Sequence, residues 1–241
     1  MRLHRLSALS AHLLPLALLW TSAWAQSPCS SDGQLPLRQL QERFMDAECE
    51  SCWTQVPPAL RWHLPPAVSV DWILPAQSGD EAPLATAARR EGQDRLAHLG
   101  LTLNQGTQTH EQLIQRSAWH LRVAQGPAVN DYLGVSVQLR LPRGVREAQV
   151  WLLLVETIPA GDEGSPVTRR LVRQVLRPDW VGRERQQGYY RTLEDARTMA
   201  IPEGAQPERL SLIAWAEDGK KRIQTMVQSV CENPPEVPQK P

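Results

Sequence analysis

Hydrophobic and polar residues alternate along much of the second half of the chain. Between residues 135 and 141, apolar residues occupy every second position, which is typical of a half-buried strand. Residues 148–155 are almost continuously apolar, which indicates a strand buried on both faces. Residues 209–217 and 222–230 flank Asp218-Gly219, a strong hairpin signal. This half is therefore predicted to be an antiparallel sheet or small sandwich.

The first half has a different pattern, in which short apolar runs alternate with helical spacing. Residues 67–74 resemble a buried strand, and residues 80–99 fit a helix that ends at Gly100. Residues 101–103 are a short strand candidate. Thr109-His-Glu-Gln112 fits a capping box, which predicts a helix that ends near residue 124. The alternation of helices and strands is typical of an α/β layout.

The N-terminus looks like an export signal. Arg2 and Arg5 precede an apolar run at residues 13–20, which is too short to span a bilayer, and Ala23-Trp-Ala25 forms a cleavage site. We predict cleavage after Ala25 and an exported, periplasmic chain, with a membrane anchor as the alternative. Four units are then expected: a signal peptide (1–25), a first domain (26–126), a β-rich domain (127–231) and a Pro-rich tail (232–241).

Composition narrows the possible functions. The net charge is zero, which gives no support to nucleic-acid binding or to attraction to a membrane surface. The chain has nine tryptophans and one phenylalanine, so we expect indole rings to fill much of the core. Six arginines between residues 169 and 185 form a basic stretch, which we interpret as a solvated face, with a docking surface as the alternative.

Candidate chemistry centres on Cys49-Glu-Ser-Cys52. At the start of a helix, unpaired backbone N–H groups would favour the Cys49 thiolate as the attacking group, and Cys52 would resolve the mixed disulfide. Pro57 follows Cys49 by eight residues, a spacing that resembles the kinked first helix of thioredoxins. Two thiolates would also be soft ligands for copper(I), which is a third and weaker alternative. A zinc site would need two more ligands at motif spacing, and the sequence does not offer them.

The surroundings of this pair oppose high reactivity. Asp46, Glu48 and Glu50 are close in sequence, and like charges at 4 Å repel by about 1 kcal/mol even in water. Thioredoxin-like enzymes also place a proline opposite the cysteines, whereas residues 101–107 contain none. Asp71 is a second candidate, because a carboxylate on an apolar strand either assists proton transfer from beneath the cysteines or ends the strand in solvent.

Cys29 and Cys231 bracket the predicted folded region. Four cysteines allow three connectivities, and we favour Cys29–Cys231 with Cys49–Cys52. The first of these bonds would close a very long loop, worth about 5 kcal/mol in the chain-entropy model. In the alternative interpretation, all four cysteines are purely structural.

Several segments resemble a bacterial family of secreted thioredoxin-like proteins of unknown function. Residues 42–52, ERFMDAECESC, resemble its ELFTSxGCSSC opening, and Val70-Asp71-Trp72 lies where the family has a His-Val-Asp-Tyr-Trp run. Residues 163–173, with Trp180-Val-Gly182, resemble its GENxGRTL…NVVR…W-x-G stretch, and residues 212–217 resemble its VAFVQD strand. The resemblance implies an α+β protein with a thioredoxin-like N-terminal domain and a β-rich, sandwich-like C-terminal domain. It implies no established reaction.

Besides the weaker copper(I) alternative, two functions stay open on the sequence alone. The first is thiol–disulfide exchange through Cys49 and Cys52 with another envelope protein as partner, without a cofactor or metal. The second is a non-enzymatic envelope module that binds or supports other proteins and is held together by its disulfides.

Overall fold

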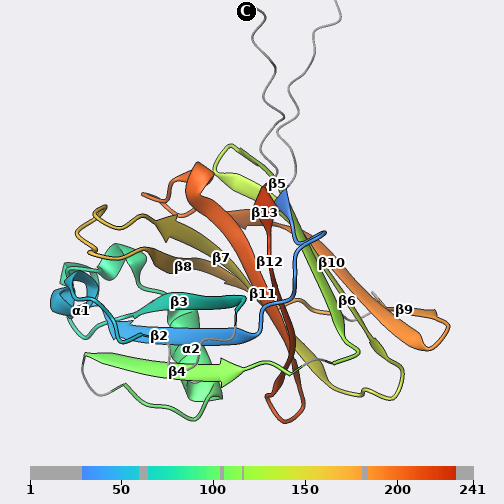
Figure 1. Ribbon diagram of the computed structural model, residues 1–241. Helices are drawn as coiled ribbons and strands as arrows, with labels where there is room; N and C mark the ends of the chain where they lie inside the picture. Colours follow the sequence, from blue (N-terminus) through green and yellow to red (C-terminus); the bar gives the residue numbers. More distant parts are fainter. Residues whose placement is uncertain (1–28, 60–64, 104–105, 116, 181–183, 232–241) are drawn as a thin grey trace, which may run out of the picture.

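The computed structural model describes residues 29–59, 65–103, 106–115, 117–180 and 184–231. Strands make up 50% of it and helices 12%. Two sheets and two short α-helices form a β-rich fold (Figure 1). The expected α+β architecture with a thioredoxin-like first domain is therefore wrong. The predicted signal peptide and Pro-rich tail lie outside the described residues.

The larger sheet has seven strands in the order β12-β11-β7-β8-β3-β2-β4. β2 and β3 are parallel, β3 and β8 are parallel, and the remaining neighbours are antiparallel. Its strands are β2 (Gln39–Asp46), β3 (Ala67–Leu74), β4 (Thr107–Leu113), β7 (Ala148–Ile158), β8 (Arg169–Leu176), β11 (Leu210–Asp218) and β12 (Ile223–Gln228).

The smaller sheet has six strands in the order β13-β1-β5-β6-β10-β9, all antiparallel. Its strands are β1 (Cys29–Ser30), β5 (His120–Val129), β6 (Tyr132–Pro142), β9 (Glu184–Gln187), β10 (Tyr190–Ala200) and β13 (Val230–Cys231). The helices are α1 (Glu50–Thr54) and α2 (Arg90–His98), with single 3₁₀ turns η1 (Gly79–Glu81), η2 (Ala85–Ala87) and η3 (Pro207–Arg209).

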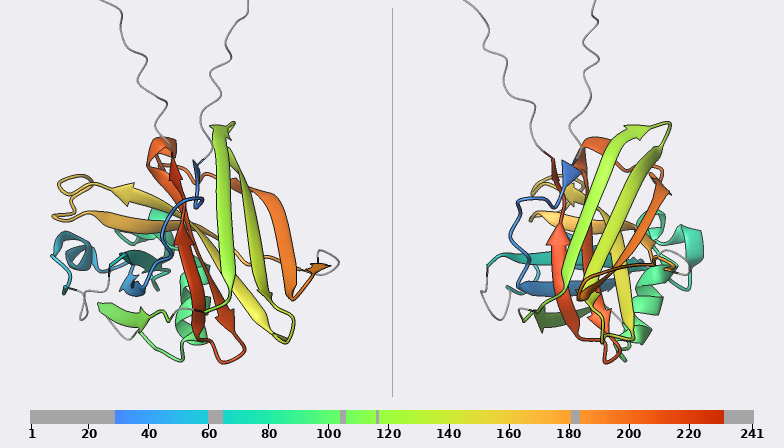
Figure 2. Two further views of the ribbon diagram at one scale, coloured as in Figure 1. Left: turned by 45° about the vertical axis from the view of Figure 1, so that its right-hand side comes forward. Right: turned by 90° about the vertical axis from the view of Figure 1, so that its right-hand side faces the viewer.

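The core is built in layers around β7 and β11. One face of these strands packs on the smaller sheet, through residues such as Leu152 and Leu212. The opposite face packs, through Trp151 and Trp215, in a cluster that includes Phe44 from β2 and residues of β3 and α2. In Figures 1 and 2, α2 lies against the larger sheet. Burial on both faces explains why residues 148–155 are continuously apolar.

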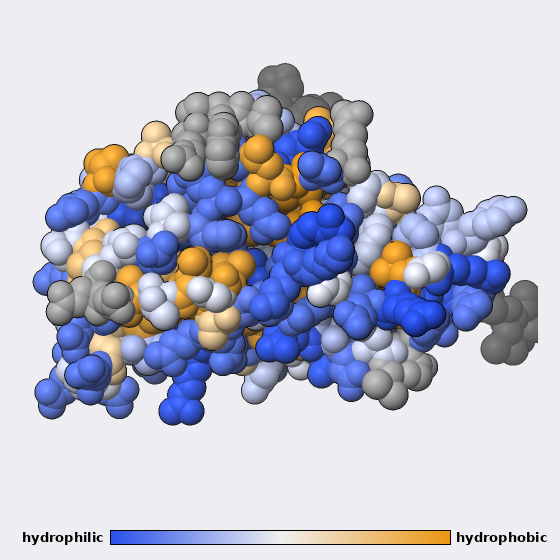
Figure 3. Space-filling view, turned by 90° about the horizontal axis from the view of Figure 1, so that it is seen from below, coloured by the Kyte–Doolittle hydropathy of each residue, from blue (hydrophilic) through white to orange (hydrophobic). Residues whose placement is uncertain are grey.

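Indole rings fill much of this interior, as the composition predicts. Trp72, Trp151 and Trp215 are each fully buried, and the rings of Trp151 and Trp215 stack with their centroids 6.3 Å apart. Seen from below, the surface is largely hydrophilic with separate hydrophobic patches (Figure 3).

The strands predicted from periodicity are confirmed at residues 67–74, 135–141 and 148–155. The hairpin at Asp218-Gly219 is formed by β11 and β12. The predicted helix at 80–99 is shorter than expected, because residues 79–81 and 85–87 form single 3₁₀ turns and only α2 is α-helical.

Two further predictions in the first half are wrong. Residues 101–103 form no strand. Where a helix was expected, residues 109–113 belong to β4 and residues 120–124 to β5. All seven residues of β4 pair with β2, so long-range pairing outweighs the local capping signal in this segment.

The seven-stranded sheet takes strands from both sides of residue 126, so the proposed division into domains at 126/127 crosses a continuous sheet and stays a prediction. Within the described part of the chain, no helix is long and apolar enough to cross a membrane.

Candidate site at the Cys49–Cys52 disulfide

Both predicted disulfides are present. Cys49 and Cys52 are bonded with their Cα atoms 5.3 Å apart, and Cys29 is bonded to Cys231 across 202 residues. β2 ends at Asp46, and the chain turns there so that Cys49 becomes the N-cap of α1. Both cysteines of the short bond are half-buried. The bond therefore lies where solvent reaches it.

The carboxylates beside this disulfide bind backbone amides. The Glu48 N–H donates to Asp46 Oδ1 at 2.9 Å, and the Ser78 N–H donates to Glu48 Oε1 at 3.1 Å. Glu50 is exposed on the first turn of α1. Because α1 has only five residues, few peptide dipoles align at Cys49, and the helix contributes less to thiolate stability than a full-length helix would.

Gly106, just before β4, lies against Cys52. The Asp46 N–H donates to the Gly106 carbonyl at 3.2 Å, and a Cβ atom built on Gly106 would be 3.9 Å from Cys52 Sγ. Gly106 has a positive φ of 75°, a backbone conformation that glycine adopts without strain. A glycine therefore lies where the absence of a proline was noted in the sequence.

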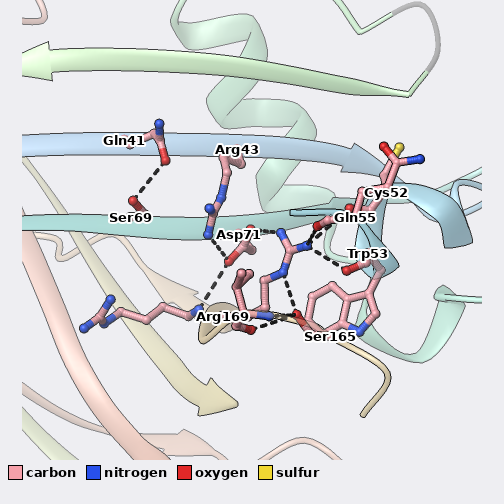
Figure 4. A network of polar contacts seen from close by, with 11 residues as sticks. Gln41, Arg43, Cys52, Trp53, Gln55, Ser69, Asp71, Ser165 and Arg169 are labelled. Carbon is pink, nitrogen blue, oxygen red and sulfur yellow. Dashed lines mark hydrogen bonds and ion pairs between the residues drawn. The ribbon is translucent and has the colours of Figure 1, made fainter. Parts of the chain in front are cut away.

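Arg169 holds the C-terminal end of α1, a role that the sequence did not reveal. Its Nη2 donates to the carbonyl oxygens of Cys52 at 3.3 Å, Trp53 at 2.7 Å and Gln55 at 2.8 Å (Figure 4). Its Nε donates to Ser165 Oγ at 3.0 Å. These contacts satisfy carbonyl groups that a helix end leaves without partners.

Asp71 lies at the centre of this network and is fully buried. Its carboxylate accepts from Arg43 Nη2 at 2.7 Å, from Arg169 Nη1 at 3.3 Å and from the Arg170 N–H at 3.2 Å (Figure 4). These three contacts come from two guanidinium groups and from the backbone of a third arginine. Arg169 also links the Asp71 carboxylate to α1. In the described part of the chain, Asp71 makes no hydrogen bond to either cysteine sulfur. Its part in proton transfer stays a prediction.

The basic stretch is not the uniformly solvated face that we expected. Arg169 is 1% exposed and Arg173 is 5% exposed. Burial lowers the pKa of the Arg169 guanidinium, and the neighbouring Arg43 lowers it further, while Asp71 opposes both effects. Arginine side chains in β8 are therefore structural members of the core. No sequence signal distinguished them from exposed arginines.

Trp53 links α1 to the loop after β7 by a hydrogen bond. Its Nε1 donates to the Glu163 carbonyl at 2.7 Å, and the Arg169 Cζ lies 5.1 Å from the centre of its ring. The side chain is buried, as expected for a core indole. Together, Trp53 and Arg169 hold α1 in place by contacts that do not involve sulfur.

The two candidate soft ligands for copper(I) are Cys49 and Cys52. Both candidate thiolates are joined in a disulfide. Over the described ranges, no group of three or more histidine, cysteine, aspartate or glutamate side chains is arranged to hold a metal ion.

Comparisons with known proteins were made at the level of sequence and of structure. No protein-family model matches the chain, and no curated protein matches it. A solved structure of HBP35 of Porphyromonas gingivalis superposes with a TM-score of 0.51, covering 86% of this chain and 80% of that chain at 7% sequence identity. At this identity the likeness concerns the fold alone.

Proposed function

We propose that this protein carries out thiol–disulfide exchange in an exported, oxidising compartment, with Cys49 as the attacking thiol and Cys52 as the resolving thiol. The reduced Cys49 thiolate attacks a disulfide of a client protein, which forms a mixed disulfide and releases one client thiolate. The Cys52 thiolate then attacks the Cys49 sulfur, which closes the Cys49–Cys52 bond and releases the second client thiol. Two electrons pass from this protein to the client, and the reverse sequence oxidises a client.

The observation that carries this proposal is that contacts other than the Cys49–Cys52 bond hold α1 in place. The bond is half-buried and closes a loop of only three residues in sequence separation. α1 is held independently by the Arg169 bonds to its carbonyl oxygens and by the Trp53 bond to Glu163. The Cys49–Cys52 bond can therefore open without releasing the helix. The Cys29–Cys231 bond instead joins two terminal strands.

Trapping a mixed disulfide tests the proposal. The Cys52→Ala variant should accumulate an adduct at Cys49 when it is mixed with a reducible protein disulfide, because the resolving thiol is missing. The Cys49→Ala variant is the matched control and should accumulate none. The reduction potential of the Cys49–Cys52 couple should lie in the range of dithiol enzymes, about −120 to −270 mV. A potential below about −300 mV together with no adduct at Cys49 would end the proposal.

A second candidate is a non-enzymatic envelope module in which both disulfides are structural. It is favoured by the short α1 and by the commitment of Asp71 to Arg43 and Arg169, which gives the cysteines weak activation. It predicts a Cys49–Cys52 bond that resists mild reductant. The two candidates thus differ in one measured potential.

We also propose that residues 1–25 direct export and are removed. The N-terminal residue of the mature chain, determined by mass spectrometry after expression in a bacterial host, should be Gln26.

A further inference from the structure

A cleft of about 770 Å³ lies beside α1. It is lined by residues from α1, η2 and β8, and by the turns near residues 163 and 203. Trp53, Ile73, Leu84 and Leu171 give it an apolar lining. Its volume is in the range of small-molecule sites, roughly 300–1,000 Å³.

Two arginines line this cleft, Arg89 and Arg173, and within the described residues only Arg173 pairs with a carboxylate. Arg173 is 5% exposed, and its Nε donates to Glu156 Oε2 at 2.6 Å. Arg89 is half-buried and donates only to backbone carbonyl oxygens, through Nε to Arg173 at 2.7 Å and through Nη1 to Thr86 at 3.1 Å and Ala88 at 2.7 Å. Across the residues that the structure describes, Arg89 forms no ion pair with a carboxylate. One positive charge in this wall is therefore unbalanced.

The surroundings of Arg89 disfavour the charged form of its side chain. Burial lowers the pKa of the Arg89 guanidinium, and the neighbouring Arg173 lowers it further, while Glu91 acts in the opposite direction. An anion that entered the cleft would stabilise the charged form of Arg89. The interaction would be stronger here than in water, because the local dielectric constant is lower.

The mouth of the cleft has the opposite charge. Glu50 and Glu203 line it and are exposed, and neither forms an ion pair within the described ranges. Glu163 is also exposed and lies 3.8 Å from an Arg209 nitrogen. These glutamates would repel a simple anion but attract an ammonium group. The cleft thus offers a cation inside, anions at the entrance and an apolar lining.

We propose that this cleft binds a short apolar peptide with free termini, whose C-terminal carboxylate pairs with Arg89. The apolar side chains of the peptide pack on Trp53 and Leu84, and its ammonium group faces Glu50 and Glu203. Such a ligand has no net charge, so the acidic mouth does not exclude it. This inference does not depend on thiol exchange.

The test uses three forms of one dipeptide and calorimetric titration against the full chain. Leucyl-leucine has both charges, leucyl-leucinamide lacks the carboxylate, and N-acetyl-leucyl-leucine lacks the ammonium group. Leucyl-leucine should bind the wild-type protein roughly 10- to 100-fold more tightly than its amide, because charge-assisted hydrogen bonds of this kind contribute that much. Equal binding of the acid and the amide, or no binding of leucyl-leucine, would overturn the inference.

Two variants assign the charges to residues. In Arg89→Gln the preference for the acid over the amide should fall below about threefold, whereas Arg89→Lys, which keeps the charge, should retain part of it. In Glu203→Gln the preference for the acid over the amide should be unchanged, and the preference for the free amine over the acetylated form should shrink. An Arg89→Gln protein that keeps the full acid preference would show that Arg89 is not the carboxylate site. If Arg89→Gln fails to fold, Arg89→Lys and the wild-type comparison decide the question.

Discussion

At the scale of single residues, Asp71 forms ion pairs with two arginines, Arg43 and Arg169. It is fully buried, and its two oxygens accept from Arg43, Arg169 and the backbone of Arg170. Its clearest role is to neutralise two guanidinium groups and to orient the one that holds α1.

Replacing Asp71 should therefore be severely destabilising. Asp71→Asn keeps the size of the side chain but leaves Arg43 and Arg169 without their shared anion. We expect the free energy of unfolding to fall by about 3–5 kcal/mol, measured by urea denaturation. Ser69→Ala is a control on the same strand, since it removes only a hydrogen bond to Gln41 and should cost about 1 kcal/mol. Equal losses in the two variants would contradict this assignment.

Asp218 should make the stability of one turn depend on pH. Burial raises the pKa of its carboxyl, but hydrogen bonds from the Arg222 side chain and from the backbone of Arg222 and Lys220 outweigh burial and lower it overall. A lowered folded-state pKa stabilises the protein above the unfolded-state value of about 3.9, and that contribution is lost as the pH falls through the folded-state pKa.

The difference in unfolding free energy between the wild type and Asp218→Asn should thus be largest near pH 6 and should shrink below about pH 4. Urea denaturation at several pH values between 6 and 3 measures it. A difference that stays constant over that range would show that ionisation of Asp218 does not stabilise the turn.

At the scale of elements, α2 is attached to the larger sheet by a buried charge. Arg95 lies with its Cζ 5.0 Å from the Trp151 ring centre and 4.9 Å from that of Trp215. It pairs with Glu42 on β2 at 2.8 Å and with Glu217 on β11 at 2.6 Å. Burial alone would lower the pKa of Arg95, but the two carboxylates outweigh it and raise the pKa. This one side chain joins α2 to two strands that are not neighbours in the sheet.

Arg95→Met should separate charge from packing. It leaves Glu42 and Glu217 buried without their cation, so we expect a loss of about 3–5 kcal/mol in thermal or urea unfolding. Adding Glu42→Gln to Arg95→Met removes one of the uncompensated charges and should recover part of that loss. A double variant that is less stable than Arg95→Met would indicate that Glu42 stabilises the protein by other contacts.

At the scale of the whole molecule, the two disulfides have different mechanical roles. Cys29–Cys231 joins β1 to β13, which pair at one edge of the smaller sheet, and so closes a loop that contains almost all of the described fold. Cys49–Cys52 closes one turn. In the chain-entropy model these loops are worth about 5 and about 2 kcal/mol, respectively.

Cysteine-to-serine pairs should reveal this difference. Cys29→Ser with Cys231→Ser should lower the free energy of unfolding by about 5 kcal/mol, whereas Cys49→Ser with Cys52→Ser should lower it by about 2 kcal/mol or less. Chemical denaturation of the two double variants side by side gives the values. If the second pair proves the more costly, the Cys49–Cys52 bond is the main structural one, and the exchange proposal loses its basis.

The sequence alone determined three strands, the hairpin and the pairing of the cysteines. A two-residue period at residues 135–141 and a continuous apolar run at 148–155 reflect burial on one or both faces of a strand, and this is local information. The close spacing of Cys49 and Cys52 likewise favours a disulfide between these two residues. With four cysteines in the chain, Cys29–Cys231 is then the second disulfide.

Only the tertiary structure decided the fold class and the surroundings of the site. Residues 109–112 have a local helix signal but become part of β4, because β2 offers a full ladder of backbone hydrogen bonds. The partners of Asp71 are distant in sequence: Arg43 by 28 residues and Arg169 by 98. Charge pairing over such separations leaves no periodic trace in the chain, because it depends on which strands become neighbours. The surroundings of Arg89 likewise depend on tertiary structure, because its partners lie on β8 and η2. The sequence alone therefore does not show that Arg89 lacks an ion pair within the described residues.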